Sequence, residues 1–193
     1  MDNTLLKDLR ETTGAGMLEV KSALDEAGGD KDKAIEILRK KGAVKVSKKA
    51  DRIANEGVIE SYIHAGGRVG VLLELNTETD FVARTDDFKA LAKELTLHIA
   101  AANPLYINIE DVPAEVIEKE REIYKEQVKD KPENIIDQIV TGKLAKYYEE
   151  ACLMEQPFVK DPERKIKDVL SEAVSKLGEK IAVRRFVRYH LGN

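Results

Sequence analysis

Residues 57–76 read GVIESYIHAGGRVGVLLELN, and this stretch decides the class of fold. Two runs rich in aliphatic and β-branched side chains flank a Gly-rich segment at 65–67. In the second run, apolar side chains occupy alternate positions from Val69 to Leu75, which is the period of a half-buried strand. Two such runs around a short turn that contains glycine predict a β-hairpin.

An isolated hairpin is not stable, so the flanking sequence must supply further strands or a helix that covers one face. From Phe88 onward, apolar side chains recur at helical spacing, and this pattern ends before Pro104. The stripe comprises Phe88, Leu91, Ala92, Leu95, Ile99 and Ala102. A third strand is predicted over 181–189. We therefore expect an α+β core domain over 57–193, in which a small antiparallel sheet packs on helices.

The highly charged segment from about 112 to 151 has a different pattern. Val116 and Ile123 lie seven residues apart, as do Ile117 and Tyr124, and a second helical stripe follows the polar turn at 129–132. That second stripe comprises Ile136, Ile139, Val140, Leu144 and Tyr147. The spacing predicts an antiparallel coiled-coil hairpin that projects from the core domain, and two ordinary surface helices are the alternative.

Residues 1–41 predict a small module of three helices. Apolar stripes begin at Leu5, Val20 and Ala34, and glycine-containing breaks separate them. Asp30 is a predicted N-cap of the third helix, and Gly42 stands where a C-terminal glycine would end it. Residues 42–56 then form a predicted basic linker, for which a helical conformation remains open. Its basic residues are Lys45, Lys48, Lys49 and Arg52.

Composition narrows the classes of function. The 193 residues include 32 Lys and Arg against 36 Asp and Glu, for a net charge of −4, which argues against general binding of duplex nucleic acid. The single cysteine, Cys152, cannot form a disulfide within the chain. No leader pattern and no run of about 20 apolar residues is present, so we expect a cytoplasmic protein that does not insert into a membrane.

The sequence lacks the local motifs of catalysis. It has no Gly-rich phosphate-binding loop, and His64, His98 and His190 are not spaced as ligands of a metal ion. We therefore expect no catalytic residue, no metal and no cofactor. A binding protein is favoured over an enzyme.

One candidate binding surface lies at the first helix break, over 9–18. If Val20 is at the centre of the buried stripe, Leu18 falls about 160° away at about 100° per residue, so it should face water. Leu18 and Met17 lie close in sequence to Arg10 across the break, and exposed apolar groups beside arginine are typical of interaction hot spots. An incidental exposed leucine is the alternative, and it is common.

A second candidate is the stretch 74–84, ELNTETDFVAR, which follows the hairpin. Thr85 and the two aspartates after it predict the N-terminus of the long helix. Phe81 lies seven residues before Phe88, so an unbroken helix would place it in the core. A break at Arg84–Thr85 would instead free it to point outward, and the sequence leaves both possibilities open.

These two stretches resemble the signature segments of the elongation factor Ts family. Residues 156–162, QPFVKDP, and 183–186, VRRF, are similar to its C-terminal motifs, and the resemblance covers essentially the whole chain. Two departures are small: Thr77 stands where Cys or Ser is usual, and Lys180 stands where Asn is frequent.

The resemblance implies that residues 1–41 form a ubiquitin-associated-like (UBA-like) module. It also implies a partner, the GTPase elongation factor Tu in its GDP form, on which the chain acts as a guanine-nucleotide exchange factor in translation elongation. The segment implied to disturb the partner's magnesium site comprises Thr79, Asp80, Phe81 and Val82. The residues implied to dock the N-terminal module on the partner are Arg10, Met17 and Leu18, and His64 matches a further contact position.

Long members of this family look like two tandem core halves, whereas this chain has one. We therefore expect a homodimer that joins through the region of the sheet. A different class of function is a ubiquitin-like or scaffold-binding module that acts through the N-terminal helices alone, which leaves 79–82 without a role. A third interpretation, RNA binding through 45–52, is disfavoured by the acidic balance and by an aromatic content of 5%.

Overall fold

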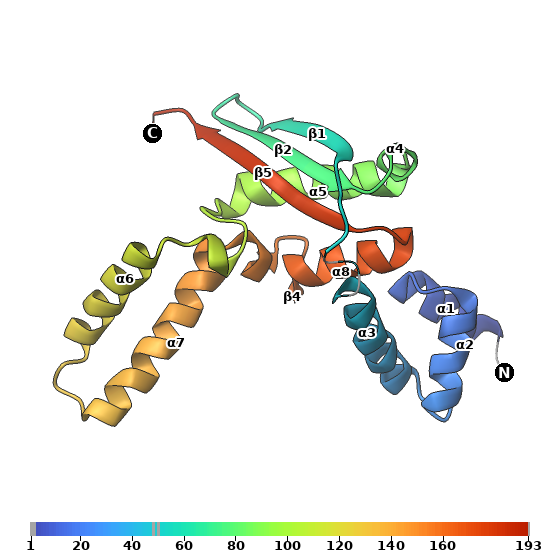
Figure 1. Cartoon of the computed structure of the whole chain (residues 1–193), viewed down its shortest axis with the longest axis horizontal. Coiled ribbons are helices and arrows are strands. Elements are labelled where there is room, and N and C mark those ends of the chain that lie inside the picture. The colour runs from blue at the N-terminus through green and yellow to red at the C-terminus, as the bar shows by residue number, and fades with distance from the viewer. Residues whose placement is uncertain (1–2, 48, 50, 193) are drawn as a thin grey trace. The chain divides into compact units, whose positions relative to one another are not determined.

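The computed structural model describes residues 3–47, 49 and 51–192 (Figure 1). Its helices are α1 (Asn3–Thr13), α2 (Met17–Glu26), α3 (Lys31–Ser47), α4 (Asp80–Ala83), α5 (Asp86–Ala102), α6 (Ala114–Gln127), α7 (Glu133–Ala151) and α8 (Ile166–Leu177). Its strands are β1 (Glu56–Ile63), β2 (Val69–Thr77), β3 (Pro157–Phe158), β4 (Asp161–Lys165) and β5 (Ile181–His190). The 3-10 turns η1 (Ile109–Asp111) and η2 (Leu153–Glu155) complete the order.

The main sheet has the strand order β1-β2-β5, which confirms the predicted hairpin, the third strand and the α+β class. Along β2, Val71, Leu73 and Leu75 are buried, as their alternation predicted. Gly57 is the second residue of β1. Its φ is 151°, and a Cβ there would lie 2.1 Å from the carbonyl oxygen of Leu75, so only glycine allows the strands to approach at this point.

Helix α5 buries the predicted apolar stripe. Phe88, Leu95 and Ile99 are fully buried, and the helix ends at Ala102, before Pro104. Near its end, the Arg188 side chain on β5 donates from Nε to the carbonyl oxygen of Ala100, at 3.2 Å. The stripe was therefore read correctly from its period, and it forms much of the core beside the sheet.

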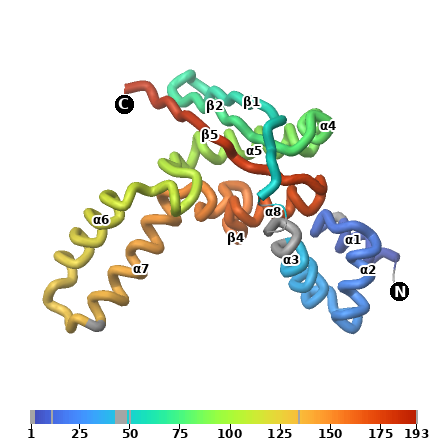
Figure 2. Tube along the Cα trace, in the orientation of Figure 1, coloured from blue at the N-terminus to red at the C-terminus, as the bar shows by residue number. Residues whose placement is uncertain are grey.

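The N-terminal helices α1, α2 and α3 pack on one another, as Figures 1 and 2 show. Their common core consists of Leu6, Leu9, Ala15, Val20, Ala23, Leu24, Ala34 and Leu38. Asp30 caps α3, because its Oδ1 accepts a hydrogen bond from the Lys33 amide at 3.1 Å. The predicted helices and cap are confirmed, while the likeness to a UBA domain stays a prediction.

The prediction that Gly42 ends the third helix is wrong. Helix α3 continues through Gly42 to Ser47, so the first part of the predicted linker 42–56 is helical. A Cβ at Gly42 would lie 3.1 Å from Oγ of Ser175 on α8, so the glycine serves a close approach between helices rather than a helix end. Lys48 and the side chain of Lys45 lie outside the described residues.

Helices α6 and α7 lie side by side and are joined by a polar turn (Figure 1). On α7, Val140 and Leu144 are buried, and Lys143 Nζ lies 5.4 Å from the centre of the Tyr124 ring on α6. Ile123 is exposed, so the stripe through Ile123 does not face α7 throughout. The projecting coiled-coil hairpin over about 112–151 and its alternative of two surface helices both stay predictions.

Two features were not predicted from sequence. Helix α8 buries Ile166, Val169, Leu170 and Val174, and the short strands β3 and β4 pair antiparallel just before it. Within the described ranges, no helix combines the length and apolarity needed to cross a membrane.

The chain divides into two compact units. One contains Met1–Tyr62, Leu72–Thr96 and Asp168–Val187, and the other contains Ile63–Val71, Leu97–Lys167 and Arg188–Asn193. The division into a module at 1–41, a linker at 42–56 and a core at 57–193 stays a prediction.

Candidate functional site

The segment after β2 turns sharply into the one-turn helix α4. Thr79 is the N-cap, with extended backbone angles, and its side-chain oxygen accepts a hydrogen bond from the Val82 amide at 3.5 Å. Its carbonyl oxygen accepts from the Ala83 amide at 3.3 Å, which closes the turn. Threonine suits this position because its hydroxyl satisfies an amide that has no partner within the helix.

A break separates α4 from α5. The Thr85 hydroxyl donates to the carbonyl oxygen of Val82 at 2.7 Å and accepts from the amide of Phe88 at 3.3 Å. Thr85 thus ends the first helix and caps the second. The predicted N-terminus of the long helix is confirmed, and the chain cannot run as one continuous helix from Asp80 to Ala102.

This break decides the position of the two phenylalanines. The Phe81 side chain is 78% exposed, whereas Phe88 is 0% exposed. Of the two possibilities that the sequence left open, the outward one holds. A large aromatic side chain held in solvent is uncommon away from binding surfaces, so Phe81 is the leading feature of the candidate site.

The other residues of the short helix divide between solvent and core. Asp80 forms an ion pair with Arg84, at 2.7 Å between Oδ2 and Nη2; the Arg84 side chain is 76% exposed and the Asp80 side chain is 44% exposed. Val82 is half-buried, and Ala83 is buried and anchors the turn. An exposed pair of this kind contributes at most about 1 kcal/mol, so Asp80 is easily released to another partner.

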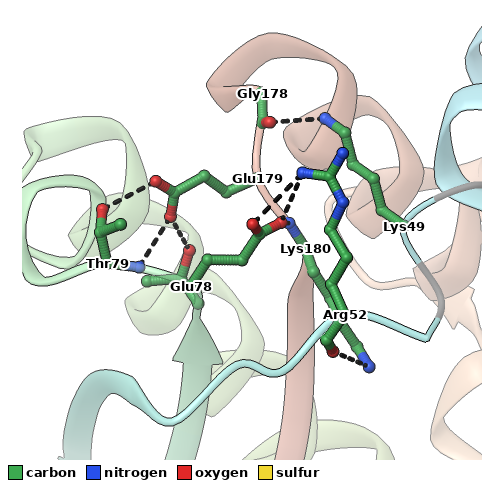
Figure 3. Close-up of polar contacts among 8 residues, drawn as sticks. Lys49, Arg52, Glu78, Thr79, Gly178, Glu179 and Lys180 are labelled. Atoms are coloured by element: carbon green, nitrogen blue, oxygen red, sulfur yellow. Dashed lines mark hydrogen bonds and ion pairs between the residues drawn. The ribbon is translucent and has the colours of Figure 1, made fainter.

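Glu179, in the turn between α8 and β5, holds the base of this segment (Figure 3). Its Oε2 accepts hydrogen bonds from the Thr77 hydroxyl at 2.8 Å and from the Thr79 amide at 3.0 Å. Its Oε1 accepts from the Thr79 hydroxyl at 2.7 Å. Partial burial raises the pKa of Glu179, but these donors outweigh it and hold the pKa below its usual value.

A second carboxylate, Glu78, ties the same turn to the segment before β1 (Figure 3). Glu78 accepts from the Lys180 amide at 2.6 Å and pairs with Arg52 at 3.2 Å. The Lys180 ammonium donates to the Arg52 carbonyl oxygen at 2.9 Å, and Lys49 donates to the Gly178 carbonyl oxygen at 2.6 Å. The predicted linker is therefore fastened to the turn that also holds Thr79.

At the N-terminal candidate surface, Leu18 is exposed as predicted. Leu18 is 83% exposed and Met17 is 45% exposed, both in the first turn of α2. Arg10 is exposed near the end of α1, where its carbonyl oxygen accepts from the Gly14 amide at 2.9 Å. These three residues stay a predicted docking surface, and their exposure is what such a surface requires.

His64 lies in the other compact unit, at the end of the β1–β2 hairpin. Its amide donates to the Val69 carbonyl oxygen at 2.8 Å, and its side chain is exposed. Its assignment as a contact position rests on the resemblance alone.

The sequence does not predict the polar residues beneath the site. Glu179 lies 100 residues after Thr79, and a carboxylate between a helix and a strand carries no local signal of so distant a partner. From the sequence, Arg52 is only one basic residue of the predicted linker. In the part of the chain that the structure describes, no group of three His, Cys, Asp or Glu side chains is placed to hold a metal ion.

Comparison with known proteins identifies the family. A family model described as elongation factor TS matches residues 20–193. The chain is 60% identical over 188 residues to elongation factor Ts of Thermotoga petrophila, covering 97% of this chain and 94% of that protein. It is 57% identical over 190 residues to the Carboxydothermus hydrogenoformans protein of the same name, covering 97% and 88%. The chain therefore belongs to the elongation factor Ts family.

Proposed function

We propose that this protein is the guanine-nucleotide exchange factor for elongation factor Tu in translation elongation, and that it acts in the cytoplasm without making or breaking a covalent bond. Membership of the elongation factor Ts family supports this function. The single structural observation that carries the mechanism is Phe81, whose ring is 78% exposed at the tip of a braced one-turn helix.

The chemistry of bound GDP explains why such a segment would be effective. GDP is held largely through its phosphates and a Mg²⁺ ion, which is a major local charge in the partner's site. An apolar ring and a carboxylate inserted nearby would favour an arrangement in which that coordination fails. Phe81 supplies the ring and Asp80 supplies the carboxylate. Thr79 and Val82 close the helical turn that carries these two residues.

Thermodynamic linkage makes the factor and GDP each promote the release of the other from the GTPase. If the factor weakens the binding of GDP by some ratio, GDP weakens the binding of the factor by the same ratio. A ternary complex forms and dissociates readily, which is the requirement for exchange. The equilibrium between nucleotide and GTPase stays unchanged, and only the rate rises.

The N-terminal surface of Arg10, Met17 and Leu18 would contribute affinity rather than chemistry. Leu18 projects into solvent on a module with its own core, as a docking residue must. Burying an exposed leucine against a partner contributes about 1.5–3 kcal/mol when burial is complete. We expect this surface to set how much factor is needed, and Phe81 to set how fast GDP leaves.

Release of fluorescent GDP from elongation factor Tu, followed by stopped flow, tests the proposal. Phe81→Ala should slow release at saturating factor by about ten- to thirtyfold, since truncation of a central aromatic residue removes about 1.4–2 kcal/mol. Asp80→Ala should slow it less. Leu105→Ala is a matched control, because Leu105 is also an exposed apolar residue and lies outside the proposed site.

The same assay separates this proposal from a binding module that acts through the N-terminal helices alone. Leu18→Asp should raise the concentration of factor needed for half-maximal release and leave the maximal rate near that of the wild type. If the module alone carried the function, Leu18→Asp would abolish it and Phe81→Ala would have no effect. Unaltered release with Phe81→Ala and Asp80→Ala would reject the proposed role of 79–82.

We also infer that the protein is a homodimer joined through the sheet region. The resemblance supports this, because this chain has one core half where long members of the family have two. Strands β1, β2 and β5 all carry exposed apolar side chains, among them Ile59, Leu72 and Val187. Apolar side chains on an otherwise regular sheet are typical of surfaces that another subunit covers.

A further inference from the structure

Phe81 does not fix its own position. Its ring is 78% exposed, so packing within the chain contributes little to where the ring stands. Helix α4 comprises only Asp80–Ala83, and a single turn is too short to be stable by itself. The direction of Phe81 must therefore be set by what holds the first residues of that turn.

Those residues are held by one carboxylate from a distant part of the chain. Glu179 accepts from the hydroxyl and the amide of Thr79 and from the hydroxyl of Thr77. Thr77 is 0% exposed, so without Glu179 its hydroxyl would lose its partner in a site that water does not reach. The Thr79 hydroxyl is also the N-cap of α4, so the contact with Glu179 passes directly to the turn that carries Phe81.

Further contacts fix the turn that carries Glu179. The next residue, Lys180, donates its amide to Glu78 at 2.6 Å, so the turn at 178–180 and the segment at 77–79 are bonded in both directions. Arg52 pairs with Glu78 at 3.2 Å and accepts from the Lys180 ammonium at 2.9 Å through its carbonyl oxygen. Figure 3 shows these contacts between Glu78, Lys180 and Arg52, next to those of Glu179 with Thr79.

We propose that Glu179 is a positioning residue for nucleotide exchange: it presents Phe81 in a fixed orientation by holding Thr79 at the start of α4. This inference rests on the proposed function. Glu179 does not touch the partner, and its effect is to preorganise the segment that does. Loss of preorganisation makes the segment adopt the productive arrangement less often, although every partner-binding side chain is still present.

The test compares Glu179→Ala with Glu149→Ala in the GDP-release assay. Glu149 is a matched control, because it is a carboxylate on α7 that pairs with Lys165 at 2.9 Å and lies outside both candidate stretches and the sheet. Glu179→Ala should lower the maximal rate of GDP release about tenfold, which corresponds to about 1.4 kcal/mol in the barrier. The concentration for half-maximal release should change less, because the N-terminal docking surface is intact. Glu149→Ala should match the wild type.

Two further variants separate positioning from a general loss of fold. Glu179→Gln keeps the shape and one acceptor oxygen, so it should restore part of the maximal rate. In the Phe81→Ala background, adding Glu179→Ala should give no further loss of rate, because there is no ring left to position, whereas it should lower the melting temperature as much as it does in the wild type. A merely structural role would instead lower rate and melting temperature together in both backgrounds.

The outcomes remain distinguishable from failure of the exchange function. If the wild type does not accelerate GDP release, the proposed function itself is rejected. If the wild type is active and Phe81→Ala is impaired, but Glu179→Ala has the wild-type maximal rate, then only the role of Glu179 is overturned. Additive losses in the double variant would overturn it as well.

Discussion

Phe81 and Phe88 are the same residue type seven positions apart, and the structure gives them opposite roles. Phe88 is fully buried on α5, while Phe81 stands in solvent. Phe88→Ala should lower the free energy of unfolding by about 3–5 kcal/mol, because it removes a fully buried ring and leaves a cavity. Phe81→Ala should change it by no more than about 0.5 kcal/mol, as exposed substitutions do.

Urea unfolding followed by circular dichroism measures both changes. The paired result matters for function, since it would establish that any effect of Phe81→Ala on exchange arises in a folded protein. Similar losses from both substitutions would contradict the assignment of Phe81 to the surface.

His98 is a buried histidine with both ring nitrogens in use. Its Nδ1 accepts from the Val159 amide at 3.3 Å, so its Nε2 carries the proton and donates to Oε1 of Gln156 at 2.9 Å. Burial lowers the pKa of His98 below its usual value, although the bond to Gln156 acts in the opposite direction. The neutral ring is therefore the form that the folded chain holds.

This pKa shift predicts a loss of stability in mild acid. The unfolded chain binds a proton at His98 near pH 6.5 and the folded chain binds it only at lower pH, so the free energy of unfolding should fall as the pH drops below about 6.5. His98→Leu should remove this dependence and also lower stability by about 1–3 kcal/mol at neutral pH, because Gln156 and Val159 lose a partner. Urea midpoints measured from pH 7.5 to 5.5 test it, and equal slopes in both proteins would refute it.

At the scale of elements, the separation of α4 from α5 depends on one hydroxyl. Thr85 donates to Val82 and accepts from Phe88, so Thr85→Ala removes the N-cap of the long helix. We expect a loss of about 1 kcal/mol in the free energy of unfolding. Thr12→Ala is the control, because the exposed Thr12 hydroxyl only donates to the Asp8 carbonyl oxygen within α1, and it should be near neutral. Equal effects on melting temperature would count against the capping role.

Elements with a regular period were predictable from the sequence, and those that depend on distant partners were not. The hairpin, α5 and β5 follow from alternation or from helical spacing, which are local properties of the chain. Gly42 was misread because a helix interior can hold a glycine where another helix approaches, and Ser175 is far away in sequence. For the site, the stretch 79–82 was found, but the exposure of Phe81 depended on a break that the sequence could only offer as one of two outcomes.

The supporting residues of the site were not predictable at all. Glu179 and Arg52 act through contacts that span 100 and 26 positions in the sequence. A carboxylate in a surface turn and a basic residue in a linker are each ordinary when seen alone. Their role follows only from the tertiary contacts that bring the 178–180 turn to the end of β2.

At the scale of the whole molecule, the proposed homodimer is directly testable. Light scattering should give twice the chain mass of 21.6 kDa at working concentration. Ile59→Asp should favour the monomer, because a charge on an apolar contact surface opposes association. Thr141→Asp on α7 is the control, since it adds the same charge at an exposed polar position outside the sheet. A monomer mass for the wild type would count against the dimer.

The burial of Cys152, the only cysteine of the chain, allows local opening of the fold to be measured. Cys152 is fully buried at the end of α7, where burial and the nearby charge of Glu155 raise the pKa of its thiol to about 11. A protonated thiol without access to solvent does not react with an alkylating reagent, because only the thiolate is nucleophilic. The rate at which iodoacetamide labels Cys152 in the wild-type protein therefore reports how often the end of α7 opens to solvent. No engineered label is needed.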